Sequence, residues 1–288
     1  MKLPVKDVEI AHSTVHVEDI GLHCVTAGPI DGPLVVLLHG FPEFWWSWRH
    51  QIPALVRAGY RVLVPDMRGY NESDKPPSVS SYSLSLLAED IRRLILSQGR
   101  DKAFVVGHDW GGVVAYEFAM HFGSMVQKLA ILNVPHPVQM QNGLRTWKQI
   151  KKSWYIFFFQ LPFLPEYWLK RNNAIFLRRS FGKSMQREEI DAYVEAAGKP
   201  GALTAMINYY RCSFRNLLTG KIRKAKVIAA PTMVIWGERD AFLEKAFAVP
   251  PKKLVPDIRV EWLPKASHWV QLDAPDRVNE LLLGFLRD

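Results

Sequence analysis

Cysteine is scarce in this chain of 288 residues, which contains only Cys24 and Cys212. The two lie far apart in the sequence and match no metal-binding spacing. A small secreted scaffold held together by disulfides is therefore excluded. We expect two free, buried thiols in a reducing compartment.

Long apolar runs are also missing. No stretch of about 18 uncharged apolar residues occurs, so no segment is expected to span a membrane. Residues 1–7 contain no apolar segment of the kind found in secretory signals. The sequence therefore predicts a soluble, cytoplasmic protein.

The net charge of +9 is unevenly distributed. Residues 134–226 contain 17 Lys and Arg against 5 Asp and Glu, so the excess lies in this one segment. One interpretation is a solvated helical surface. The other is attraction to an anionic membrane surface or an acidic substrate. Binding to nucleic acid is not indicated, because no recognised motif accompanies the charge.

Short apolar segments alternate with helical ones along most of the chain. Continuous apolar runs such as 33–38 suit strands buried on both faces, and the apolar spacing over 82–98 is typical of a helix. The predicted strands are 14–17, 22–26, 33–38, 61–64, 102–106, 129–132, 233–236 and 259–262. The first two suggest an antiparallel hairpin. We therefore predict an α/β fold with a mostly parallel, eight-stranded sheet flanked by helices.

The segment 134–226 interrupts this alternation. It is basic, rich in aromatic residues and helical in its spacing, and it includes six consecutive apolar residues from Trp154 to Phe159. We expect a helical cap inserted between two core segments, 1–133 and 227–288. Such a cap would cover the carboxyl ends of the strands, where open α/β sheets place their sites.

A carboxylate stands at the centre of the most informative motif, Gly-His-Asp-Trp-Gly at residues 107–111. A buried strand precedes it and an apolar helix follows over 113–122. This is the nucleophile elbow of the α/β-hydrolase fold, in which Gly107 and Gly111 are expected to allow a sharp turn. Lipases and esterases carry Ser at the centre, whereas Asp109 can form an ester with an electrophilic carbon. The motif indicates epoxides or alkyl halides rather than esters or amides.

An ester on the enzyme must be hydrolysed, which requires a base for water and an acid to orient the base. His268 follows the last strand and Asp240 follows the strand before it, in the chain order of α/β-hydrolases. Glu238 lies two residues from Asp240 and is the alternative acid. Some related folds place the acid after the strand that precedes the cap. That position holds Asn133, which cannot ionise, and this favours Asp240.

Two backbone N–H groups are candidates for an oxyanion hole, which would stabilise the charge formed when water attacks the ester. One belongs to Trp110, directly after the nucleophile. The other belongs to the loop after the strand 33–38, where the sequence His-Gly-Phe-Pro points to Phe41.

At these residues the chain resembles the epoxide hydrolase branch of the α/β-hydrolase family, over about residues 15–286. The segments that carry the resemblance are His39-Gly40-Phe41-Pro42-Glu43, Asp66-Met67-Arg68-Gly69-Tyr70 and Gly107-His108-Asp109-Trp110-Gly111. The resemblance implies a pair of cap tyrosines that bind the epoxide oxygen. Tyr155, five residues before Gln160, resembles the first, and Tyr210 resembles the second. Tyr209 is the neighbour with which Tyr210 could be confused.

The resemblance implies an epoxide hydrolase that forms a vicinal diol and needs no metal or organic cofactor. Asp109 would attack the epoxide while Tyr155 and Tyr210 hold its oxygen. His268, oriented by Asp240, would then activate water. The many cap aromatics suggest a small apolar epoxide with a bulky or lipid-like substituent. The sequence gives no indication of an oligomeric state.

Two alternatives to an epoxide hydrolase remain open, a dehalogenase and a non-catalytic binding protein. A haloalkane dehalogenase shares the aspartate and often a following tryptophan, but it needs a second halide donor, either an Asn where Phe41 stands or a cap Trp. Fluoroacetate dehalogenases carry Arg where this chain has Trp110. A non-catalytic ligand-binding protein of this fold is the second alternative. Such members usually lose the nucleophile or the histidine, and this chain keeps both.

Overall fold

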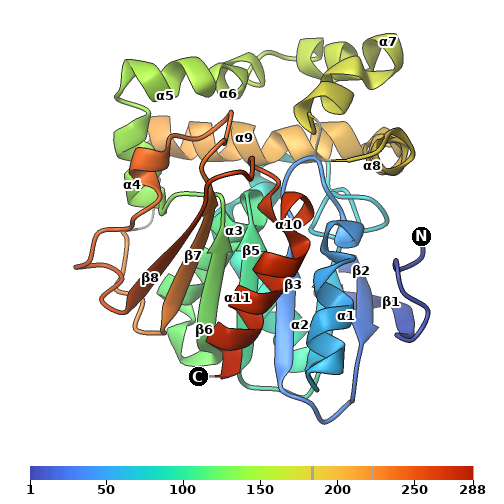
Figure 1. The fold of residues 1–288 in the computed structure, drawn as a ribbon. Coiled ribbons are helices and arrows are strands. Elements are labelled where there is room, and N and C mark those ends of the chain that lie inside the picture. Colours follow the sequence, from blue (N-terminus) through green and yellow to red (C-terminus); the bar gives the residue numbers. More distant parts are fainter. Residues whose placement is uncertain (183–184, 222–223, 288) are drawn as a thin grey trace.

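An eight-stranded sheet forms the centre of the molecule. The computed structural model describes residues 1–182, 185–221 and 224–287. The strands are β1 (Ile10–Val17), β2 (Ile20–Ala27), β3 (Leu34–Leu38), β4 (Arg61–Pro65), β5 (Ala103–His108), β6 (Val126–Leu132), β7 (Thr232–Gly237) and β8 (Ile258–Leu263). Their spatial order is β1-β2-β4-β3-β5-β6-β7-β8 (Figure 1).

The strands pair mostly in parallel. β2 pairs antiparallel with β1 and with β4, and every other neighbouring pair is parallel. The predicted fold class and the N-terminal hairpin are therefore confirmed. β1 begins at Ile10 rather than at residue 14, because most of its side chains are exposed and it has no apolar run to reveal its start.

Helices cover both faces of the sheet. They are α1 (Gln51–Arg57), α2 (Leu84–Ser97), α3 (Trp110–His121), α10 (Val270–Asp273) and α11 (Pro275–Arg287). Short 3-10 helices lie at η1 (Trp45–Trp48), η2 (Val79–Tyr82), η3 (Gly123–Met125) and η4 (Lys245–Phe247). Figure 1 shows α1 and α11 on one face and α2 and α3 on the other. β3 is buried along its whole length between these layers, as its continuous apolar sequence predicts.

The part of the chain that the structure describes contains six more helices between β6 and β7. They are α4 (Pro137–Gly143), α5 (Trp147–Lys152), α6 (Trp154–Phe158), α7 (Leu164–Ser180), α8 (Arg187–Gly198) and α9 (Ala202–Leu218). Figure 1 shows them together at one end of the sheet, with α9 next to the strands and α5, α6 and α7 farther out. The described residues of 134–226 contain no strand. We propose that this segment forms a cap subdomain, and we call it the cap.

Both cysteines are free and buried, as expected from their spacing. Cys24 lies in β2 and Cys212 in α9. Burial raises the pKa of each thiol above its usual range. Within the described ranges, the structure contains no helix with the length and apolar character needed to cross a bilayer.

Candidate active site

The nucleophile elbow joins β5 to α3 through a single residue, Asp109. Its φ of 48° is positive, which is uncommon for a residue with a side chain. Gly107 and Gly111 do not share this conformation. A Cβ atom at Gly111 would instead lie 2.2 Å from the carbonyl oxygen of Leu38. The aspartate itself therefore makes the turn, and the glycine allows the elbow to pack against β3. α3 begins at Trp110, three residues before the predicted start.

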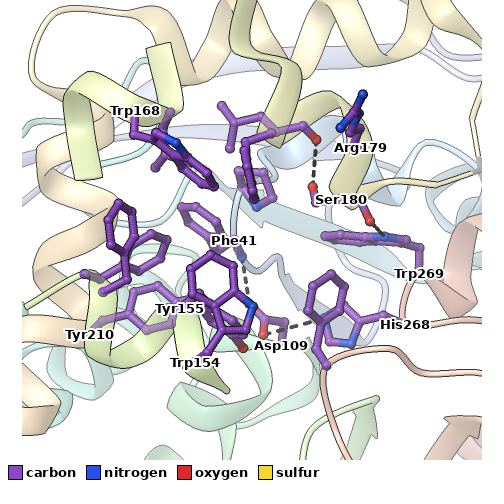
Figure 2. A pocket seen from close by; sticks show the side chains of 17 residues that line it. Phe41, Asp109, Trp154, Tyr155, Trp168, Arg179, Ser180, Tyr210, His268 and Trp269 are labelled. Atoms are coloured by element: carbon purple, nitrogen blue, oxygen red, sulfur yellow. Dashed lines mark hydrogen bonds and ion pairs between the residues drawn. The ribbon is translucent and has the colours of Figure 1, made fainter. Parts of the chain in front are cut away.

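His268 lies between two carboxylates (Figure 2 shows its approach to Asp109). Its Nδ1 is 2.7 Å from Oδ2 of Asp240, and its Nε2 is 3.7 Å from Oδ2 of Asp109. The first distance is a hydrogen bond and the second is a longer ion-pair contact. Oδ1 of Asp240 accepts the backbone N–H groups of Phe242 and Leu243, at 2.7 and 2.9 Å. These bonds fix Asp240 in the orientation that holds the imidazole.

Asn133 supports the same carboxylate from the end of β6. Its Nδ2 donates to Oδ2 of Asp240 at 2.8 Å, and its Oδ1 accepts the N–H of Gly237 at 2.8 Å. The alternative acid, Glu238, instead forms an ion pair with Lys245 at the surface. The structure thus brings Asp240, and not Glu238, to His268.

Mutual attraction keeps these buried groups charged. Burial favours a lower pKa for His268, but the carboxylates of Asp240 and Asp109 outweigh it and raise the pKa to about 10. Burial would raise the pKa of Asp109, yet its contacts with His268 hold it below the usual range. The pKa of Asp240 is lowered in the same way, with burial opposed mainly by His268. At neutral pH the resting site therefore holds an imidazolium between two carboxylates.

The two predicted oxyanion donors lie on either side of the elbow, and one of them bonds to the Asp109 carboxyl. The N–H of Phe41 donates to Oδ1 of Asp109 at 2.8 Å (Figure 2). That of Trp110 belongs to the first residue of α3, and an N–H at this position has no acceptor within its own helix. The positive end of the helix dipole reinforces both groups as partners for an anion. The structure thus brings the N–H of Phe41 to the nucleophile and leaves that of Trp110, the next residue, free of a partner within its own helix.

Tyr155 of α6 and Tyr210 of α9 reach the nucleophile from the cap. Their rings meet edge to face with centroids 5.9 Å apart, and both side chains border the same cavities as Asp109. Burial raises the pKa of both phenols well above the usual value, and the charge of Asp109 raises it further. Both hydroxyls therefore stay protonated and can donate.

Tyr209 has a different environment from its neighbour. Its hydroxyl donates to the backbone carbonyl of Arg68 at 2.7 Å, and the side chain is fully buried. Both rings pack edge-on against Trp110, but only Tyr210 also meets Phe41 and borders the two cavities. The structure therefore separates the two adjacent tyrosines into one that contacts the core backbone and one that borders the cavities.

Two cavities meet at Asp109, Tyr155 and Tyr210. The first has a volume of about 270 Å³ and also contains His268. Its other walls are mostly aromatic and include Phe41, Trp154, Phe158, Phe159, Trp168, Phe176, Phe242 and Trp269. The second has a volume of about 440 Å³ and extends between α3, α4 and α9. Its walls include Val113, Met120, Val134, Val138, Met140, Leu144, Ile156 and Phe214. The site is therefore a mostly apolar space with the Asp109 carboxylate and the two phenols at the junction.

Glu43 and His108 form a buried ion pair behind the site that the sequence analysis missed. Oε2 of Glu43 lies 2.7 Å from Nδ1 of His108 and accepts the N–H of Gly40 at 2.9 Å. Nε2 of His108 lies 2.9 Å from the carbonyl oxygen of His268. Gln271 donates to Oε1 of Glu43 at 2.8 Å. This network ties together the oxyanion loop, the elbow and the loop of the candidate base. Its partners are far apart in sequence, so no local pattern could reveal it.

Glu43→Gln should destabilise the protein by about 3–5 kcal/mol, because it removes one partner of a fully buried pair. The side-chain amide of Gln would also place an N–H group next to Gly40 N and Gln271 Nε2, which both donate to the carboxylate of Glu43. Urea unfolding at neutral pH measures the loss, and kcat should fall as the three loops lose their alignment. Glu238→Gln is the matched control, since its partly exposed pair with Lys245 is worth at most about 1 kcal/mol. Equal stability of the two variants would show that the buried pair does not hold the loops.

Within the described ranges, no group of three or more His, Cys, Asp or Glu side chains is arranged to hold a metal ion. Asp109, Asp240 and His268 are instead engaged with one another and with Phe41 and Asn133.

Fold and elbow together define a hydrolase of the α/β type. Residues 33–275 match the family described as alpha/beta hydrolase fold. The chain is 42% identical over 280 residues to the AB hydrolase superfamily protein YfhM of Bacillus subtilis (strain 168), covering 95% of this chain and 97% of the relative. It is 40% identical over 291 residues to Epoxide hydrolase 4 of Homo sapiens, covering 96% and 79%.

Solved structures of epoxide hydrolases have the same fold as this chain. The crystal structure of Bacillus megaterium epoxide hydrolase in complex with an inhibitor superposes with a TM-score of 0.87 at 31% identity, covering 96% of this chain and 100% of that one. The chain belongs to the α/β-hydrolase fold family, in its epoxide hydrolase branch. The family resemblance inferred from residues 107–111 and the oxyanion loop is confirmed, and the protein is a hydrolase.

Proposed function

We propose that this protein converts an epoxide and water into a vicinal diol through an ester on Asp109. The observation that carries the proposal is the meeting of one carboxylate and two protonated phenols, Tyr155 and Tyr210, at the junction of two apolar cavities. An epoxide needs a nucleophile on carbon and a proton donor on oxygen, and this junction offers both. The relatives named as epoxide hydrolases support the same activity.

The first step opens the ring. An Oδ atom of Asp109 bonds to one epoxide carbon, and the C–O bond of that carbon breaks. The electron pair moves to the ring oxygen, which takes a proton from Tyr155 or Tyr210. Two phenol donors stabilise the negative charge that develops on this oxygen. The products are a hydroxyalkyl ester and a tyrosinate.

Esterification also prepares the base. It removes the charge of Asp109, which is one of the two carboxylates that raise the pKa of His268. The imidazolium proton can then pass to the tyrosinate, leaving a neutral imidazole held by Asp240. This change explains how a histidine that is charged in the resting site can act as a base one step later.

The second step hydrolyses the ester. Neutral His268 takes a proton from water, and the water oxygen attacks the ester carbonyl carbon. The N–H groups of Phe41 and Trp110 stabilise the oxyanion. When the oxyanion collapses, the bond between the carbonyl carbon and the alkyl oxygen breaks. The diol leaves with the proton from His268, and the new carboxylic acid of Asp109 passes its own proton to the neutral imidazole of His268, which restores the resting site.

The shape of the site suggests the substrate class. Because the two cavities meet at the nucleophile, an epoxide there can place one substituent in each. Their volumes of about 270 and 440 Å³ and their apolar walls favour a small core carrying apolar, bulky groups. We therefore propose styrene-like or fatty epoxides as the class, rather than small polar ones.

A single turnover in heavy-oxygen water tests the covalent route. With enzyme in excess over styrene oxide, the first diol should contain an unlabelled oxygen from Asp109, and the label should appear in the enzyme. A labelled diol in the first turnover would instead show direct attack by water. Styrene oxide should react faster than glycidol, and 1-bromobutane should release bromide far more slowly than styrene oxide gives diol. Rapid bromide release without diol formation would identify a haloalkane dehalogenase.

A further inference from the structure

The outer layer of the cap is unusually apolar for a surface. Among the described residues, seventeen large apolar side chains are exposed, and eight of them lie between residues 147 and 176. They are Trp147, Trp154, Phe157, Leu161, Phe163, Leu164, Tyr167 and Phe176. Phe163 is 86% exposed and Trp147 is 70% exposed. These residues belong to α5, α6, α7 and the turn between α6 and α7, which lie on the side of α9 away from the sheet (Figure 1). We call this surface the cap outer face.

Basic residues are interspersed with these aromatics. Residues 137–182 contain eight Lys and Arg but a single acidic residue, Glu166, which is bound to Arg211 at 2.7 Å. Three of the eight pair with Glu244 or Asp191 from outside this range, and Arg179 borders the first cavity. The other four are Arg145, Lys151, Lys170 and Arg171. The amino group of Lys151 lies 5.5 Å from the ring centre of Trp147, and the guanidinium of Arg171 lies 5.9 Å from that of Tyr167. Side chains that are apolar at the base and cationic at the tip suit the boundary between lipid and water.

We propose that the cap outer face binds the surface of an anionic lipid bilayer. Exposed aromatic groups would enter the boundary between headgroups and acyl chains, and the Lys and Arg side chains would contact anionic headgroups. Charge argues against a second copy of this chain as the occupant. Two such faces in symmetric contact would bring the basic side chains of Lys151, Lys170 and Arg171 together, and the one acidic residue of 137–182 is already paired with Arg211.

The same helices also form a wall of the first cavity. Trp154, Trp168 and Phe176 border it together with Asp109 and His268. A lipid surface at the cap outer face would therefore lie next to the space that holds the nucleophile. Apolar epoxides concentrate in lipid, so docking would bring the enzyme to its substrate. This consequence rests on the proposed function, whereas the docking itself does not.

Vesicle binding tests the proposal without any reaction. The purified full chain should sediment with vesicles of phosphatidylcholine mixed with phosphatidylglycerol, and much less with phosphatidylcholine alone. Added salt should weaken the binding. Lys170→Gln with Arg171→Gln should reduce affinity about 30-fold, since each basic group near such a surface contributes a factor of about five. Phe163→Ser with Tyr167→Ser should reduce it about tenfold or more.

Matched controls lie on the core. Ile30 is 73% exposed and precedes β3, so it lies near the amino ends of the parallel strands, at the end of the sheet away from the cap. Ile30→Ser should leave vesicle binding unchanged, and so should Lys252→Gln with Lys253→Gln, which removes two exposed charges from the core. None of the four substituted cap residues borders either cavity, so hydrolysis of a water-soluble epoxide should continue in both cap variants.

The proposal fails if both cap variants bind anionic vesicles as tightly as the unaltered protein, or if binding ignores lipid charge and salt. Sedimentation velocity without lipid tests whether the cap outer face binds a second copy of this chain instead. A dimer that the Phe163→Ser and Tyr167→Ser changes convert to a monomer would assign the face to a second copy. Vesicle binding without epoxide turnover would keep the docking surface and reject the proposed reaction.

Discussion

His268→Gln should stop the enzyme after the first chemical step and leave a covalent adduct on Asp109. Steady-state turnover should fall about 10³–10⁴-fold, the upper range for loss of a general base. Ring opening should continue, because it needs the carboxylate of Asp109 and the two phenols rather than a base. The adduct adds the full mass of the epoxide, since no atom leaves when the ring opens. Intact-mass spectrometry measures it, and peptide mapping locates it.

Adduct formation in this variant should also be slower than in the unaltered protein at neutral pH. His268 is the main group that holds the pKa of Asp109 below its usual range, and burial opposes it. Without the imidazolium the pKa of Asp109 rises, so the fraction of carboxylate falls. The rate of adduct formation should therefore increase with pH in the variant. This dependence distinguishes a protonated nucleophile from a misfolded site.

Asp109→Asn is the control for the adduct, because its amide cannot attack carbon in the same way. It should show no added mass, alone or combined with His268→Gln. If His268→Gln gives no adduct with a reactive epoxide at any pH, Asp109 is not the nucleophile. Residual turnover by Asp109→Asn that still depends on His268 would then indicate direct attack by activated water.

The sequence predicted the sheet well because burial leaves a clear pattern. β3 and β7 are fully buried, and their apolar runs end within two residues of the predicted bounds. The cap was harder. α7 breaks at residues 171–174, where Asn172 and Asn173 have left-handed backbone conformations, and amphipathic spacing does not locate such a break. Short cap helices take their bounds from the neighbours against which they pack.

For the candidate site, too, the sequence predicts some residues and gives no sign of others. Asp109, Asp240 and His268 each follow a strand, so chain order and strand position are enough to predict them. The residues that support these three leave no such pattern. In the sequence Asn133 stands out only because it cannot ionise, whereas the structure shows that it donates to Asp240. Glu43 reaches partners in three segments, and that contact depends on how the strands are ordered in the sheet.

Tyr155→Phe combined with Tyr210→Phe should abolish ring opening and spare hydrolysis of the ester. Each substitution removes one donor to the developing alkoxide, and one such donor is worth about 10²–10³ in rate. Because the remaining phenol can still donate in a single variant, the double variant should lose about 10⁴-fold or more. Rapid quenching followed by intact-mass measurement gives the rate of adduct formation in each variant.

Ester hydrolysis can be measured separately with 2-bromo-1-phenylethanol. Displacement of its bromide by Asp109 gives a hydroxyalkyl ester that styrene oxide also forms, and bromide leaves without a proton. The double variant should load this ester and then release diol at close to the unaltered rate. Its second step relies on His268 and on the N–H groups of Phe41 and Trp110, which the substitutions do not touch.

Tyr209→Phe provides the matched control for this pair. It removes a hydroxyl from the adjacent residue of the same helix, and this hydroxyl donates to the backbone carbonyl of Arg68. It should cost about 1 kcal/mol or somewhat more in unfolding free energy and leave ring opening unchanged. Equal losses in ring opening and ester hydrolysis for the Tyr155 and Tyr210 variants would mean that the phenols shape the cavity rather than act on the epoxide oxygen. A selective loss of ring opening, absent from Tyr209→Phe, can arise only from donors that act where the alkoxide forms.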